Sequence, residues 1–210
     1  MGGVYKKDSS LNVGKDDIEM ANSKLIIVEG AQGVGKTTVA DFIRHSIKYT
    51  NLYRLTGTSD SSKSGKIKAE KMYNDLSNYI KSLENLSISL LFDRTFFSEE
   101  VYCRLGFKEY SFTDVYEKQL EGLSKMDFEI YYITLYLKDE SLFNERLDRE
   151  GKAVVDYAKF KLESSINQQK EYLKIADEIK ANYPNINVVN IDNGRDFEEV
   201  SKELLELLGK

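Results

Sequence analysis

The sequence predicts a three-layer α/β fold, in which a five-stranded parallel sheet is flanked by helices. Two features carry this prediction. Short apolar runs alternate with longer amphipathic segments along the chain, and the first apolar run leads into a glycine-rich turn. Strands that alternate with helices form parallel sheets, because each helix returns the chain to the same end of the sheet. The length of 210 residues suits one hydrophobic core.

The five predicted strands are apolar runs that lie near residues 24–28, 52–56, 87–92, 130–137 and 186–191. A helix is predicted over residues 36–48, and another over 196–208, whose apolar residues fall on one side. The clearest helical period precedes the last strand, and its apolar members are Val155, Ala158, Leu162, Ile166, Leu173, Ala176 and Ile179. Pro184 marks the connection from this helix to the last strand.

Two segments lack a regular apolar pattern. Residues 1–22 contain glycine, serine and charged residues, and we predict a flexible N-terminal tail ahead of a single domain over residues 23–210. Residues 56–66 are rich in serine and glycine, which predicts a flexible loop beside the active site.

Composition excludes several classes of function. The formal net charge of -5 argues against binding to nucleic acid polymers or anionic membranes, and favours small anionic ligands in a local basic pocket. No apolar run approaches the roughly 20 residues of a membrane span, so we expect no membrane insertion and a cytoplasmic protein. Because Cys103 is the only cysteine and His45 the only histidine, an internal disulfide and a cysteine and histidine zinc site are excluded, and Ser-His-Asp hydrolysis nearly so.

The glycine-rich turn at residues 30–37 reads Gly-Ala-Gln-Gly-Val-Gly-Lys-Thr and fits the Gly-x4-Gly-Lys-Ser/Thr phosphate loop. Its glycines let backbone N–H groups surround a triphosphate, Lys36 reaches the β and γ oxygens, and the Thr37 hydroxyl binds a magnesium ion. A turn without a ligand is the alternative, which the apolar strand directly before the motif disfavours. We therefore predict ATP and Mg²⁺ as cofactors, with ATP contacts from Gly30, Gln32, Gly33, Val34, Gly35, Lys36, Thr37 and Thr38.

A second polar site follows the third predicted strand, which delivers Asp93 and Arg94 at its C-terminal end, where open α/β sheets place ligands. With Ser98 and Tyr102 this gives Asp-Arg-x3-Ser-x3-Tyr, which resembles the thymidylate kinase family in residue type and spacing. Further pieces that resemble this family are Ile27-Val28-Glu29-Gly30, Arg54 with Gly57-Thr58, Tyr136-Leu137, Glu140 and Ile191-Asp192. The resemblance covers about residues 24–205 and implies a P-loop kinase fold with phosphotransferase activity. Related deoxynucleoside kinases share the phosphate loop, the acidic-Arg strand end and an arginine-bearing lid.

Phosphoryl transfer between two nucleotides brings negative oxygens together, so cations must surround donor and acceptor. The candidate catalytic cations are Lys36, Arg94, Arg146 and Arg149. Arg94 is expected to bind the acceptor phosphate, and a structural ion pair with Asp93 is the alternative. Thr37 and Asp93 are the predicted magnesium ligands, although Asp93 would also suffice to orient Arg94 alone.

Arg146 and Arg149 lie three residues apart and resemble the arginine-bearing lid that closes over ATP, which we place near residues 144–153. The alternative is a solvated helix end in which Glu145 pairs with Arg149.

The resemblance also implies substrate contacts. Ser98 would face the acceptor base, Tyr102 would lie beside the sugar, and the loop that holds Asn193 would contact adenine. Arg54 and Phe97 are further candidates, with a surface position for Arg54 and a core position for Phe97 as the alternatives.

The chain departs from the thymidylate kinase pattern at two places. Arg54-Leu55-Thr56-Gly57 stands where that family usually has Arg-Glu-Pro-Gly, and where deoxynucleoside kinases keep the carboxylate that takes a proton from a sugar hydroxyl. A monophosphate acceptor carries an ionised oxygen nucleophile and needs no such base. Gln32 replaces the acidic residue that thymidylate kinases commonly hold near the sugar 3′-hydroxyl.

Together with the resemblance to thymidylate kinases, these residues predict an ATP-dependent nucleoside monophosphate kinase that transfers the γ-phosphoryl group to a (deoxy)pyrimidine monophosphate. One alternative is a deoxynucleoside kinase, for which Asp60 is the nearby loop carboxylate. Another is a non-catalytic P-loop nucleotide-binding protein; a guanine-nucleotide switch is disfavoured because the sequence lacks Asn-Lys-x-Asp. The expected partners are small-molecule nucleotides, and a homodimer is expected only by resemblance to thymidylate kinases.

Overall fold

One sheet of five parallel strands, in the order β2-β3-β1-β4-β5, forms the centre of the computed structural model, which describes residues 23–147 and 162–210. The strands are β1 (Lys24–Gly30), β2 (Thr50–Arg54), β3 (Ser89–Asp93), β4 (Glu129–Tyr136) and β5 (Ile186–Asp192). β1 and β4 are buried along nearly their whole length, as expected of apolar strands covered on both faces. The edge strands β2 and β5 also carry exposed residues.

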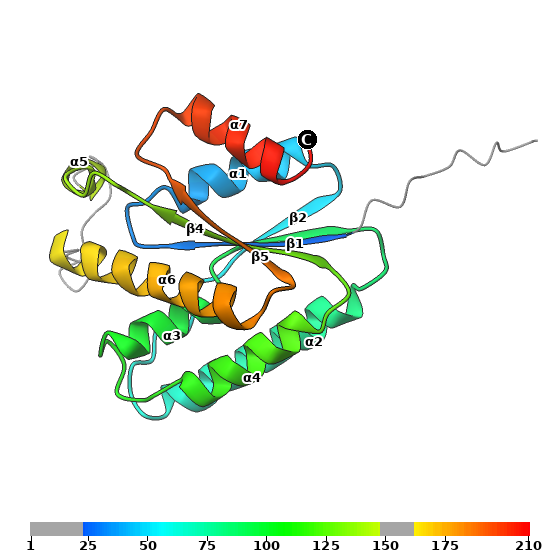
Figure 1. Ribbon diagram of the computed structural model, residues 1–210. Helices are drawn as coiled ribbons and strands as arrows, with labels where there is room; N and C mark the ends of the chain where they lie inside the picture. The colour runs from blue at the N-terminus through cyan, green and yellow to red at the C-terminus, as the bar shows by residue number, and fades with distance from the viewer. Residues whose placement is uncertain (1–22, 148–161) are drawn as a thin grey trace, which may run out of the picture.

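Helices cover both faces of the sheet (Figure 1). On one face lie α1 (Lys36–Ser46) and α7 (Phe197–Leu207). On the other face lie α2 (Gly65–Ser82), α3 (Phe96–Arg104), α4 (Thr113–Ser124) and α6 (Leu162–Asn182). The short α5 (Leu142–Leu147) follows β4. The predicted three-layer fold with a five-stranded parallel sheet is confirmed.

The core consists of two hydrophobic clusters, one on each face of the sheet. Successive side chains of β1 alternate between them, so that Leu25 and Ile27 pack in one cluster and Ile26 and Val28 in the other. This alternation explains why the first apolar run has no polar residue between Leu25 and Val28, since neither face of β1 meets solvent.

The element boundaries differ from the predicted ones most clearly at β2. This strand covers Thr50–Arg54 instead of residues 52–56, because its partner β3 ends at Asp93, opposite Arg54. The predicted N-terminal tail and residues 155–161 of the predicted helical period lie outside the described residues. Within the described ranges, no helix is both long and apolar enough to cross a bilayer.

β1 and β3 are neighbours in the sheet, and the connections that follow these two strands run to opposite faces. The chain leaves β1 toward α1 on one face and leaves β3 toward α3 on the other (Figure 1). Such a point opens a crevice at the carboxyl ends of the strands, where α/β proteins bind their ligands. Both polar sites predicted from the sequence, after β1 and after β3, therefore border the same crevice.

Candidate active site

The phosphate loop joins the end of β1 to the start of α1. Gly35 caps α1 with a φ of 94°, and a Cβ atom there would lie 2.5 Å from Asn193 Nδ2, so a side chain would strain the backbone and displace the Asn193 amide. The cap provides no side-chain hydrogen bond, and the first turn of α1 contains no acidic residue. The N–H groups at this helix start are therefore suited to bind an anion.

Lys36 is buried beneath this loop, and its Nζ donates to the carbonyl oxygens of Gly30 and Ala31 at 2.7 Å each. Burial lowers the pKa of Lys36, and the nearby Arg94 lowers it further, whereas Asp93 opposes the change. Phosphate oxygens beside Nζ would raise this pKa again. The ammonium group thus lies where a phosphate in the loop would stabilise its charged form.

A hydroxyl and a carboxylate face each other across the crevice. Thr37 Oγ1, on the exposed first turn of α1 next to Thr38, donates to Asp93 Oδ2 at 3.3 Å. Asp93 is the last residue of β3, lies opposite Val28 of β1, and is 6% exposed. Oxygen atoms of this kind are the ligands that Mg²⁺ prefers, so the two residues fit a magnesium ion shared with nucleotide phosphates.

Arg54 extends from the end of β2 toward the same carboxylate. Its Nε lies 3.8 Å from Asp93 Oδ2, and its Nη2 donates to Asp41 of α1. The side chain is about half exposed, so this ion pair is weak and the guanidinium group stays accessible to a ligand.

Arg94 follows Asp93 with a φ of 73°, a left-handed conformation that costs a residue with a side chain about 1–2 kcal/mol. Its N–H donates to Val28 O at 3.1 Å. Burial alone would lower the pKa of Arg94, but Tyr102, Tyr172 and acidic neighbours raise it above its ordinary value. Arg94 is thus a half-buried cation, held in a strained backbone conformation next to Asp93.

Glu29, at the end of β1, is fully buried beside Arg94. Its carboxylate accepts hydrogen bonds from Thr95 N at 2.7 Å, from Thr95 Oγ1 at 3.1 Å and from Ser98 Oγ at 2.7 Å. Burial raises the pKa of Glu29 to about 7, although these hydrogen bonds and the nearby Lys36 oppose the change.

The predicted substrate contacts on α3 are placed differently from the expectation. Ser98 Oγ is buried between Glu29 and the Tyr172 hydroxyl, 2.7 Å from each, and so belongs to a buried network instead of an open base site. Phe97 is also fully buried, with its ring 4.3 Å from Phe96 and in the core, which agrees with the alternative of a packing role. Consecutive residues on one helix point in different directions, so a motif spacing alone does not tell which one faces a ligand. Tyr102 is half-buried and lies close enough to Arg94 to affect the pKa of both groups.

Arg146 and Asn193 meet the phosphate loop from two other elements. Arg146 of α5 donates to Val34 O at 3.1 Å and to Asn193 O at 2.7 Å, and Asn193 Nδ2 donates to Val34 O at 2.7 Å. These contacts place both residues at the phosphate loop. Arg149 lies outside the described residues, as do all residues of the predicted lid after Leu147.

Two glutamines of α6 contribute contacts that the sequence did not identify. Gln168 accepts a hydrogen bond from the backbone N–H of Gln32 at 3.3 Å. Gln169 Oε1 accepts from the backbone N–H of Leu137, and Gln169 Nε2 donates to the carbonyl oxygen of the same residue. Both side chains are buried. An amphipathic period marks such residues only as lying on the packed face of the helix, so their partners follow from the tertiary structure.

Glu99 is a second buried carboxylate that sequence reasoning missed, because it follows Ser98 directly and matches no motif. It accepts from Thr58 N at 3.3 Å and from the Tyr110 hydroxyl, and Lys108 Nζ lies 3.2 Å from it. The carboxylate therefore reaches the loop after β2 at Thr58, two residues before Asp60.

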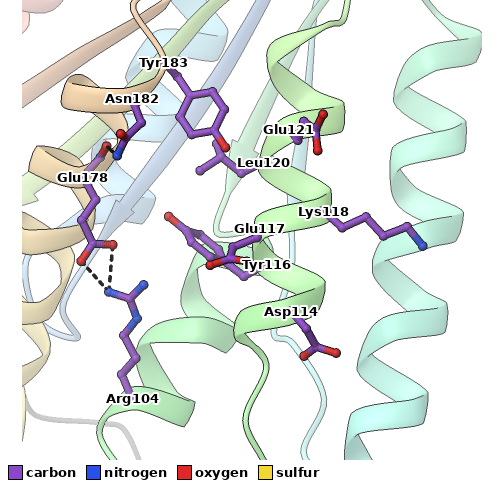
Figure 2. A pocket seen from close by; sticks show the side chains of 10 residues that line it. All are labelled: Arg104, Asp114, Tyr116, Glu117, Lys118, Leu120, Glu121, Glu178, Asn182 and Tyr183. Atoms are coloured by element: carbon purple, nitrogen blue, oxygen red, sulfur yellow. Dashed lines mark hydrogen bonds and ion pairs between the residues drawn. The ribbon is translucent and has the colours of Figure 1, made fainter.

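Figure 2 shows a surface groove between α4 and α6, away from the phosphate loop. Its charged lining consists of four acids and two bases, namely Asp114, Glu117, Glu121, Glu178, Arg104 and Lys118. The guanidinium group of Arg104 is paired with Glu178 at 3.0 Å. An acidic lining with its arginine already paired is unsuited to nucleotide phosphates, so this groove is not a second candidate for the active site.

No protein family model matches the chain, and no curated protein matches it. Among solved structures, thymidylate kinase from Candida albicans is similar with a TM-score of 0.64 at 17% identity, over 90% of this chain and 92% of that chain. Deoxyadenosine kinase from M. mycoides with dCMP and dCDP bound has a TM-score of 0.61 at 14% identity, over 88% and 98%. The same enzyme with bound dATP has a TM-score of 0.60 at 14% identity, over 89% and 99%. The chain therefore has the P-loop nucleotide kinase fold that these two kinases share.

Proposed function

We propose that the protein is an ATP- and Mg²⁺-dependent nucleoside monophosphate kinase whose acceptor is a (deoxy)pyrimidine monophosphate. The observation that carries this proposal is the crevice between β1 and β3, in which Lys36 and Arg94 follow adjacent strands and Thr37 faces Asp93 at 3.3 Å. Cations on both sides of a metal-binding pair suit transfer between two phosphorylated molecules.

In this reaction an acceptor phosphate oxygen forms a bond to the γ-phosphorus of ATP, and the bond from that phosphorus to the β–γ bridging oxygen breaks. Lys36 offsets the charge on the β and γ oxygens, and Arg94 orients the acceptor phosphate. Arg146 holds the Val34 carbonyl of the phosphate loop. Thr37 and Asp93 would hold Mg²⁺, which supplies positive charge to the phosphate oxygens.

The state of Asp60 favours a monophosphate over a nucleoside acceptor. This carboxylate pairs with Lys68 and accepts hydrogen bonds from Ser62 and Ser64. The hydrogen bond from Lys68, followed by those from Ser62, holds the pKa of Asp60 below its usual range. A carboxylate with a low pKa is a weak general base, whereas a monophosphate acceptor needs none.

A deoxynucleoside kinase is the second candidate, because Glu99 reaches the loop at Gly57 and Thr58 from α3. A Cβ atom on Gly57 would lie 2.9 Å from Glu99 Oε2, so the carboxylate approaches the backbone closely. This carboxylate would have to exchange a donor for a sugar hydroxyl before it accepted a proton.

The test is an ATP-consumption assay with Mg²⁺ over a panel of nucleosides and nucleoside monophosphates, with products resolved by chromatography. Lys36→Ala, purified in parallel, controls for contaminating kinases. A new diphosphate from a pyrimidine monophosphate is the expected result. A new monophosphate that Glu99→Gln abolishes would assign the protein to the second candidate, and no acceptor-dependent product would overturn both.

A further inference from the structure

The turn that carries Arg94 is fixed by a single side chain from the neighbouring strand. Glu29 Oε1 accepts both the N–H and the hydroxyl of Thr95, at 2.7 Å and 3.1 Å, and Oε2 accepts the Ser98 hydroxyl at 2.7 Å. Thr95 follows directly on Arg94, whose φ of 73° is rare for a residue with a side chain. Such a conformation persists only where the surrounding structure enforces it.

The Glu29 carboxylate accepts its hydrogen bonds from Thr95 and Ser98, in and just after this turn. Lys36 Nζ, the nearest catalytic cation on the same loop, donates to the Gly30 and Ala31 carbonyls instead. The backbone adds a parallel link, since Arg94 N donates to Val28 O, one residue before Glu29. The end of β1 therefore holds the backbone N–H groups of both Arg94 and Thr95.

We propose that Glu29 is a positioning residue that directs the Arg94 guanidinium group toward the acceptor phosphate through Thr95 and Ser98, without contacting a nucleotide itself. The proposal rests on the proposed function for the identity of the Arg94 ligand. Glu29 is 0% exposed, so its side chain does not reach solvent.

Two variants distinguish the effect of the Glu29 charge from the effect of its hydrogen bonds. In Glu29→Gln the amide oxygen still accepts from Thr95, and the amide nitrogen donates to Ser98 Oγ, whose hydroxyl turns toward the Tyr172 oxygen 2.7 Å away. In Glu29→Ala all three donors lose their acceptor. A positioning role therefore predicts that Glu29→Gln keeps the kcat/KM for the acceptor that Glu29→Ala loses.

Steady-state kinetics compare these variants with Glu100→Gln, an equally buried glutamate of α3 that accepts from Arg104 and Thr113. We expect Glu29→Ala to lower kcat/KM for the acceptor on the order of tenfold to a hundredfold, since small misplacements have effects of this size. The KM for ATP should stay within about threefold, as should all parameters of Glu29→Gln and Glu100→Gln.

Equal losses in Glu29→Gln and Glu29→Ala would overturn the proposal, because the charge would then be what matters. So would an unchanged acceptor kcat/KM in Glu29→Ala. If Glu29→Ala does not fold, Thr95→Val and Ser98→Ala each remove one hydroxyl donor and should each lower the acceptor kcat/KM, and an effect in neither would count against the role.

A structural readout is independent of turnover. Crystal structures of the two Glu29 variants should show Arg94 outside the left-handed region in Glu29→Ala and inside it in Glu29→Gln. A left-handed Arg94 in Glu29→Ala overturns the proposal. If the parental protein phosphorylates no acceptor, the proposed function fails, while these structures still decide whether Glu29 fixes the turn.

Discussion

Asn193 and Arg146 converge on one carbonyl of the phosphate loop. Asn193 Nδ2 donates to Val34 O at 2.7 Å, and Arg146 Nη1 donates to the same oxygen at 3.1 Å. Arg146 Nη2 also donates to Asn193 O at 2.7 Å, which links α5 to the turn after β5. A carbonyl oxygen has two lone pairs, and these donors use both. The loop, α5 and the turn after β5 are therefore expected to act together when ATP binds.

Asn193→Ala should weaken ATP binding about two- to tenfold, because one hydrogen bond to the loop contributes about 0.5–1.5 kcal/mol. Isothermal titration calorimetry with ATP measures the change. Asn187→Ala is the matched control, since Asn187 Nδ2 donates to Ile130 O at 3.1 Å from the start of β5, the strand that Asn193 follows. Equal losses of affinity in the two variants would show that Asn193 acts through general stability instead of through the loop.

Arg94→Ala should lower kcat/KM for the acceptor by about a hundredfold or more, while the Kd for ATP changes less than about threefold. The reason is that Arg94 follows β3, across the crevice from the phosphate loop that is predicted to bind ATP. Arg104→Ala is the control, because Arg104 is a partly buried arginine of α3 that pairs instead with Glu100, Glu171 and Glu178. A parallel loss of ATP affinity in Arg94→Ala would contradict an acceptor-side role.

The sequence predicts those parts of the site whose geometry is local. The phosphate loop is a turn between adjacent elements. Thr37 and Asp93 are 56 residues apart, but each is placed by its own segment, since Thr37 begins the helix after β1 and Asp93 ends β3, and the carboxyl ends of these paired strands lie side by side. The order of strands and helices likewise follows from apolar periods that depend on near neighbours.

The rest depends on contacts between distant segments. Glu29 is 66 residues from Thr95 and 69 from Ser98, and its role appears only when β1 and β3 pair. The sequence pattern gives Ser98 and Phe97 the right spacing for a site, but the packing of Tyr172 and Phe96 decides that both are buried. Buried polar networks are specified by tertiary packing, which no single-segment pattern encodes.

Glu29→Gln should become more stable relative to the parental protein as the pH rises. Burial raises the pKa of Glu29 from 4.5 to about 7, so the folded protein binds this proton more tightly than the unfolded chain does. Protonated Glu29 therefore stabilises the folded parental protein. This stabilisation is fully present below the pKa of Glu29 in the unfolded chain, and it is lost as the pH rises through the pKa of Glu29 in the folded protein. Glutamine does not titrate. Urea unfolding of both proteins without nucleotide, at about pH 5 and about pH 8, measures the difference, and an equal difference at both values would contradict the prediction.

Asp93→Asn should raise the Mg²⁺ concentration that gives half-maximal turnover by about tenfold or more, because an amide oxygen attracts the ion less than a carboxylate does. Thr37→Ser should keep the parental Mg²⁺ dependence, since it retains the hydroxyl that lies 3.3 Å from Asp93, and chelation with EDTA should abolish turnover in every variant. Asp41→Asn is the control, because Asp41 is the other partner of Arg54 but lies exposed on α1. If Asp93→Asn lowers turnover without changing the Mg²⁺ dependence, Asp93 orients Arg94 or Arg54 and does not bind the metal. If Asp41→Asn reproduces the Asp93 effect, the position of Arg54 accounts for both.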